Sequence, residues 1–162
     1  MKSRVTLGIT IATFLLIASV KCFSQTDTSI VKFKNTLSVW SPKGYSQASI
    51  IDLGNAQMII ISGQVPFDIN GNLVGKGDLG KQTEQVFSNI KSILIESGGT
   101  MYNLVKIGIY MTDISQLPTF RDVRNKFINI NYPPTSTLVQ VSKLFRDDVL
   151  PEVDAMAIIP KK

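Results

Sequence analysis

The chemistry open to this chain is restricted by the residue types that it lacks. Its 162 residues include no histidine and a single cysteine, Cys22, which lies in a segment that we expect to be removed. The remaining chain then has no thiolate nucleophile, no disulfide and none of the usual zinc ligands, so we expect neither a metal nor another cofactor. Two features remain as candidates for catalysis: the segment Ser62-Gly63-Gln64-Val65-Pro66 and Glu152 near the C-terminus.

These candidates have the residue types that general acid–base chemistry requires. Glu152 can exchange a proton near neutral pH if partial burial and the nearby Asp154 carboxylate raise its pKa. A glycine inside a strand, such as Gly63, often marks the close approach of a backbone or a ligand. The alternative for the two acids is a solvated edge pair beside Lys143 or Arg146, and the sequence leaves both interpretations open.

The first 24 residues predict a secretory signal peptide. Lys2 and Arg4 precede an apolar run from Leu7 to Val20, and the small residue Ser24 marks the expected cleavage site. The run is short for a membrane span, which needs roughly 20 apolar residues, although an uncleaved anchor is the alternative. Cleavage leaves 14 basic against 12 acidic residues, a formal net charge of +2. We expect a periplasmic or secreted protein that binds neither membrane nor nucleic acid, since no basic stripe is interleaved with aromatic residues.

The hydrophobic pattern predicts one domain, residues 40–162, after an N-terminal extension or edge strand at 25–39. The expected order is β-β-α-β-α-β-β, with helices at 78–97 and 117–128 and strands at 49–53, 57–62, 105–111, 137–144 and 152–159. Strand–helix–strand connections favour parallel crossovers, and hairpins add antiparallel pairs. The result is an α+β fold, a mixed sheet with two helices on one face.

The strand at 105–111 predicts an oligomer. Val105, Ile107, Ile109 and Met111 alternate toward one face, and the opposite face of this strand and of 137–144 is also too apolar to meet water. A second copy of the chain would cover that face.

From Pro42 to Ile159 the chain resembles the Rid family of imine and enamine deaminases. The matching segments are Gly44-Tyr45-Ser46-Gln47-Ala48, Ser62-Gly63-Gln64-Val65-Pro66, Gly77-Asp78-Leu79, Gln82-Thr83, Asn89-Ile90, Val105-Lys106, Thr112-Asp113, Tyr132-Pro133-Pro134 and Glu152-Val153-Asp154-Ala155. The resemblance implies a chorismate-mutase-like fold and a homotrimer with sites between subunits. It also implies water addition to the C=N bond of 2-imino acids, which releases ammonia and a 2-keto acid.

The resemblance assigns roles residue by residue. Glu152 matches the family glutamate that holds the attacking water, whereas the ligand-site positions are Tyr45, Ser62, Gly63 and Leu138. The N–H of Gly63 would face the substrate carboxylate. From the residues alone, Tyr45 is almost as well explained as a core tyrosine, and Ser62 as a hydroxyl bonded to the backbone.

The chain departs from the family at the carboxylate-binding position. The family's deaminases carry an arginine after the proline pair, where this chain has Ser136, and a serine hydroxyl does not replace a bidentate guanidinium. Arg121 falls where some members have an asparagine, and it either supplies the missing charge or is a solvated helix residue. Two functions follow: an exported hydrolase with substrate choice altered at Ser136, or a trimeric binding protein without the chemistry.

Overall fold

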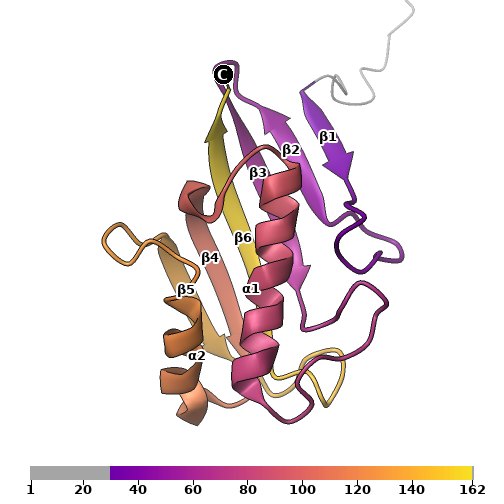
Figure 1. Ribbon diagram of the computed structural model, residues 1–162, viewed down its shortest axis with the longest axis vertical. Helices are drawn as coiled ribbons and strands as arrows, with labels where there is room; N and C mark the ends of the chain where they lie inside the picture. Colours follow the sequence, from indigo (N-terminus) through magenta and orange to yellow (C-terminus); the bar gives the residue numbers. More distant parts are fainter. Residues whose placement is uncertain (1–29, 162) are drawn as a thin grey trace, which may run out of the picture.

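In the computed structural model, which describes residues 30–161, the β-rich segments join in one six-stranded sheet of order β1-β2-β3-β6-β4-β5 (Figure 1). The described strands are β1 Val31–Lys34, β2 Ala48–Asp52, β3 Ala56–Gln64, β4 Leu104–Met111, β5 Thr135–Gln140 and β6 Pro151–Pro160. The described helices are α1 Leu79–Glu96 and α2 Leu117–Arg124, with short 3-10 turns η1 Met101–Asn103 and η2 Ile114–Gln116. The expected signal peptide, residues 1–24, lies outside the described residues. Nothing helical in residues 30–161 has the length and apolar character that a membrane crossing needs.

The sheet is mixed, as predicted, but its last strand takes a central place. β2 and β3 form the expected antiparallel hairpin, and β4 pairs in parallel with β5 across α2. β6 lies between β3 and β4 and is antiparallel to both, so it does not pair with β5, its predecessor in the chain (Figure 1). β1 pairs with β2, so the segment expected as an extension or an edge strand contains an edge strand.

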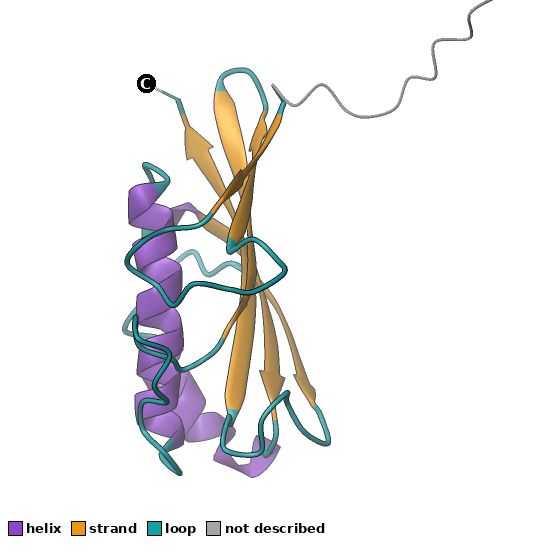
Figure 2. Ribbon diagram, turned by 90° about the vertical axis from the view of Figure 1, so that its right-hand side faces the viewer, coloured by secondary structure: helices purple, strands orange, loops and turns teal. Residues whose placement is uncertain are grey.

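Both helices lie on one side of the sheet (Figure 2). α1 begins after Asp78, whose carboxylate accepts the N–H of Lys81 at 3.0 Å, and it ends before Gly98, where φ is +83°. A left-handed residue at this position terminates helices, and glycine adopts it without a Cβ clash. The sequence predicted both ends, because a cap residue and a glycine flank the apolar periodicity.

Two predicted boundaries are wrong for identifiable reasons. α2 ends at Arg124 rather than at 128, because the chain turns there and stacks Phe127 on Phe87, with ring centroids 5.5 Å apart. β5 ends at Gln140 rather than at 144, because its partner β4 ends at Met111.

The inward face of β4 was predicted correctly except at its first position. Val105 is 41% exposed, whereas Ile107, Ile109 and Met111 are buried. The register between β4 and β6 shifts at Leu104 to Lys106, so Val105 is an extra residue in a bulge and Leu104 faces the core instead.

The two faces of the sheet differ in what covers them. On the helix side, alternate residues of β3, β4 and β6 are buried against α1, among them Ile59, Ile107 and Val153. On the open side, Figure 2 shows no helix, and apolar side chains such as Ile60 remain partly exposed there. The open face is therefore partly apolar, which is the property on which the prediction of an oligomer rests.

Candidate functional site

Two carboxylates of β6 lie on the open face, each against a glycine of a neighbouring strand. A β-carbon on Gly63 of β3 would overlap Oε1 of Glu152 and lie 2.8 Å from its Cδ. A β-carbon on Gly108 of β4 would lie 2.5 Å from Oδ2 of Asp154. The missing side chains at 63 and 108 therefore provide the space that these carboxylates occupy. Among residues 30–161 no three acidic, histidine or cysteine side chains gather closely enough to hold a metal ion.

The environment of Glu152 favours its protonated form. Burial raises the pKa of Glu152, and the Asp154 carboxylate raises it further. No ion pair found among residues 30–161 includes either acid, and Arg146 pairs instead with Asp148 at 2.7 Å. The Tyr110 hydroxyl donates to Oδ2 of Asp154 at 3.1 Å. The acids are therefore a partly buried pair rather than a solvated edge pair beside Arg146.

The pairing of β3 with β6 is irregular beside Glu152. The register shifts between Ile61 and Gln64, so the regular ladder is interrupted at Ser62 and Gly63. Bulges of this kind are common next to functional sites, where they redirect side chains. The Ser62 hydroxyl donates to the carbonyl of Ser46 at 2.7 Å, which is the backbone-bonded state considered above.

Tyr45 is not a core tyrosine, because it is 50% exposed. Partial burial, followed by the charge of Glu152, raises the pKa of its hydroxyl. Tyr45 therefore keeps its proton at neutral pH and can donate a hydrogen bond.

A cavity of about 460 Å³ lies over Glu152. It brings together four residues proposed from the sequence and adds three others; together they are Tyr45, Ser62, Gly63, Glu152, Trp40, Val65 and Phe145.

Three other residues proposed from the sequence do not line this cavity. Arg121 is exposed on α2, on the helix side of the sheet. Ser136 and Leu138 of β5 pair with Ile107 and Ile109, whose side chains face the helices, so they share that face. Within one chain, the sheet therefore separates these residues from Glu152.

The sequence did not identify the aromatic wall of the cavity. Trp40 stands edge-on to Phe67 with ring centroids 5.5 Å apart. Phe145 meets the same Phe67 ring at 5.8 Å. Nothing in the local sequence signals this cluster, because its members come from three separate loops.

Buried amides on α1 hold the loops on both sides of the cavity. Gln82 donates to the carbonyl of Asp148 at 2.8 Å and accepts the N–H of Leu150 at 2.8 Å, just before Glu152. Asn89 donates to the carbonyls of Val65 and Phe67, both at 3.1 Å. These two residues were identifiable from the sequence as polar residues at inward helical positions.

We expect Gln82→Leu to lower the free energy of unfolding by roughly 2–4 kcal/mol, because each buried backbone group left without a partner costs roughly 1–3 kcal/mol. Urea denaturation measures the change. Glu84→Leu, at an exposed position of the same helix, is the control and should change stability little. Equal stability of the two variants would contradict the role of Gln82 as an anchor.

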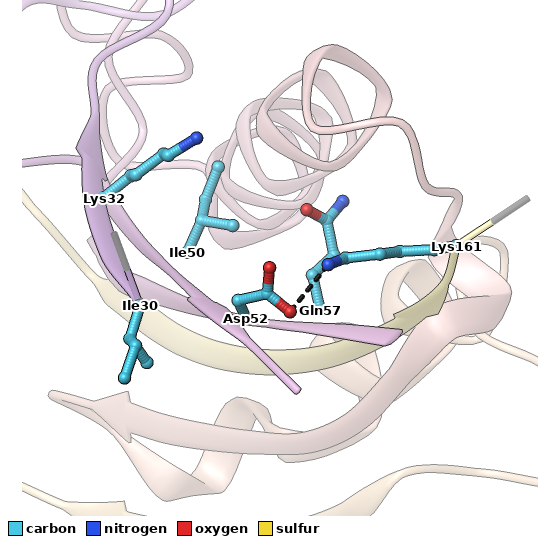
Figure 3. Close-up of a pocket in the computed structure, with 6 residues that line it drawn as sticks. All are labelled: Ile30, Lys32, Ile50, Asp52, Gln57 and Lys161. Carbon is cyan, nitrogen blue, oxygen red and sulfur yellow. Dashed lines mark hydrogen bonds and ion pairs between the residues drawn. The ribbon is translucent and has the colours of Figure 1, made fainter. Parts of the chain in front are cut away.

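A second hollow, shown in Figure 3, is lined by Gln57 near the start of β3 and by Lys161 after the end of β6, whereas Glu152 lies near the start of β6. Within it, Lys161 pairs with Asp52 at 2.6 Å, and the Gln57 amide donates to the carbonyl of Ser97 at 2.7 Å. The hollow lies beyond the end of α1 and shares no lining residue with the cavity over Glu152. We therefore place the candidate site at Glu152.

Comparison with known proteins gives a consistent result. The sequence model of the family described as endoribonuclease L-PSP matches residues 36–159. A RutC family protein of Pyrococcus abyssi is 36% identical over 113 residues, which cover 70% of this chain and 84% of that protein. A protein of Dermatophagoides farinae named 2-iminobutanoate/2-iminopropanoate deaminase is 29% identical over 115 residues, which cover 71% of this chain and 85% of that protein.

A solved structure shows the same architecture. The crystal structure of RidA from the Antarctic bacterium Psychrobacter sp. PAMC 21119 superposes with a TM-score of 0.69 at 30% identity, covering 79% of this chain and 99% of that one. With most of the described chain matched in sequence and in fold, this protein belongs to the Rid family.

Proposed function

We propose that this protein is a hydrolase that adds water to the C=N carbon of a small imine, or of the imine into which an enamine tautomerises, with Glu152 as the acid–base group. The observation that carries the proposal is the position of Glu152, which lies against Gly63 in the cavity and has a raised pKa. A carboxylate with a pKa nearer neutral exchanges protons more effectively at physiological pH. The deaminase name of a relative supports the same reaction class.

In the proposed reaction, the water oxygen bonds to the C=N carbon while Glu152 takes a proton from the water. Glu152 delivers this proton to the nitrogen, which gives a carbinolamine. It then transfers the remaining hydroxyl proton to the same nitrogen as the C–N bond breaks, the carbonyl forms and ammonia leaves. The protonated hydroxyl of Tyr45 can donate to the charge that develops during addition. Atoms balance with water as the only co-reactant.

We expect Asp154→Asn to shift the rising limb of the activity–pH profile to lower pH. The Asp154 charge, after burial, raises the pKa of Glu152, so its loss lets Glu152 ionise at a lower pH. The other titratable groups around Glu152 are Tyr45 and Tyr110. Asp154 does not raise the pKa of Tyr45, whereas Tyr110 loses the hydrogen bond and the charge of Asp154 that raise its pKa. Initial rates between pH 5 and 9 measure the midpoint, and Asp122→Asn on α2 is the control. An unchanged midpoint would show that Asp154 does not influence the reacting carboxylate.

We further propose a homotrimer that covers the open face and brings Ser136 of one subunit toward the cavity of the next. Ser136→Arg should then raise activity on 2-imino acids by about one to two decades, because it supplies a charge-assisted contact worth roughly 1.5–3 kcal/mol. Ammonia release from 2-iminopropanoate measures the gain, and light scattering measures the assembly. If light scattering shows a stable monomer at micromolar concentration, Ser136 cannot contribute to the cavity of a neighbouring subunit.

We propose separately that the protein is exported. N-terminal sequencing that finds a start at Gln25 would support this proposal.

A further inference from the structure

The cavity over Glu152 contains one charged side chain, and that charge is negative. Among the described residues that line it, Glu152 is the only acidic or basic side chain besides Tyr45, whose raised pKa keeps its hydroxyl neutral. The nearest basic residue along the chain from Phe145 is Arg146, which is paired with Asp148 and lies over the Phe67 ring at 5.0 Å. An anionic ligand would therefore meet a carboxylate in this cavity, and none of the residues that line it within one subunit supplies a cation.

The rest of the lining is largely aromatic and held in place. Trp40 and Phe145 both meet the buried Phe67 ring nearly at right angles, at 89° and 84°. Gln47 donates to the carbonyl of Trp40 at 3.0 Å, and a β-carbon on Gly71 would lie 2.6 Å from Nε1 of Trp40. Phe145 is 61% exposed, so much of its ring remains available to a ligand.

Aromatic walls beside a carboxylate suit one kind of ligand. Ring faces bind other rings by offset or edge-on packing, and they attract cations. The volume of about 460 Å³ is within the range of small-molecule sites and accommodates a ligand with one ring.

We infer that the cavity takes a C–N compound that has an aromatic substituent and no carboxylate, as the neutral imine or its iminium cation. The inference rests on the proposed function and names its substrate class. The hydrolysis is R–CH=NH + H₂O → R–CHO + NH₃, with Glu152 moving both protons of the water to the nitrogen in turn. Trp40 and Phe145 determine the preference for the ring, and Glu152 disfavours a carboxylate on the substrate.

Binding tests this class of ligand without requiring turnover. Trp40 is the only tryptophan of the chain and lines the cavity, so its fluorescence reports occupancy. Two probes share a phenyl ring and differ in charge: 2-phenylethylamine is a cation, and 3-phenylpropanoate is an anion. At pH 8.5, where more of Glu152 is ionised, we expect the amine to bind at least tenfold more tightly. Equal or tighter binding of the carboxylate overturns the inference.

Variants separate the contribution of charge from that of the ring. Glu152→Gln should reduce the difference between the two probes to less than threefold, because it removes the charge and keeps the shape. Phe145→Ala should weaken the binding of both probes about tenfold. Tyr102→Ala removes an exposed aromatic side chain that does not line the cavity, and it should leave the affinity for both probes unchanged. If Phe145→Ala has no effect on either probe, the cavity is not the binding site and the inference is wrong.

Kinetics separates the substrate class from the reaction itself. Amine oxidase acting on 2-phenylethylamine and amino-acid oxidase acting on phenylalanine generate imines that share the ring and differ in the carboxylate. We expect the protein to accelerate ammonia release over the spontaneous rate at least tenfold more for the imine from 2-phenylethylamine than for the imine from phenylalanine. Equal acceleration leaves the hydrolase proposal in place and overturns the substrate class. If neither imine is accelerated, the hydrolase proposal fails, and the binding comparison alone decides the ligand class.

Discussion

Glu152→Gln is expected to lower the rate of imine hydrolysis by about 10²–10⁴-fold, the usual contribution of a general acid–base group. Glutamine keeps the shape and hydrogen-bonding capacity of the side chain beside Gly63 but cannot exchange the proton. Ammonia release from imines generated by an oxidase measures the loss, and light scattering shows whether the assembly is intact. Glu84→Gln, an exposed glutamate of α1, is the matched control and should retain full activity.

The same variant has a second readout, which depends on the direction of the pKa shift. Folding raises the pKa of Glu152, so the folded state binds this proton more tightly than the unfolded state. The stability that the proton provides is fully present below the ordinary value of 4.5 and is lost as pH rises through the folded pKa. Relative to the unmodified protein, Glu152→Gln should therefore gain stability as pH rises above 4.5, as thermal unfolding at several pH values will show.

Failure of this prediction has a specific meaning. If no imine or enamine is turned over and Glu152→Gln alters only ligand affinity, the protein is a binding protein that keeps the cavity without the chemistry. If the unmodified protein is active and Glu152→Gln keeps more than a tenth of the rate, another group exchanges the proton. In either case, Glu152 does not have the catalytic role proposed for it.

Gly63→Ala should reduce activity about 10²-fold, because a catalytic group displaced by about 1 Å can lose that much rate. The backbone of Gly63 is outside the left-handed region, so alanine is allowed there. The added methyl group would instead overlap the Glu152 carboxylate and force it away from β3. We expect a stability cost of roughly 1–3 kcal/mol from this overpacking.

The matched control is Gly80→Ala in α1, where the nearest atom to an added β-carbon is 3.3 Å away. This change should leave activity unchanged and should not destabilise the helix, since alanine is favoured over glycine there. Steady-state kinetics on both variants, with a crystal structure of Gly63→Ala, tests the prediction. Full activity in Gly63→Ala with Glu152 displaced would show that the position of the carboxylate against β3 is not needed.

The sequence by itself determined the types and most of the limits of the secondary structure elements. Asp78 and Gly98 flank an apolar helical period, and α1 follows it closely. The sequence also singled out Glu152 and Gly63: the family resemblance selected Glu152 among the 12 acidic residues, and a glycine inside a strand often marks a close approach. These inferences hold because caps, turns and periodicity are local properties of the chain.

Only the tertiary structure decided which of these residues meet. Periodicity shows which side chains of one strand share a face, but it does not show which strands pair, since pairing depends on long-range packing. The central place of β6 brings Glu152 to Gly63, and the same topology puts Ser136 on the opposite face. Trp40 and Phe145 form one wall only because separate loops converge on Phe67.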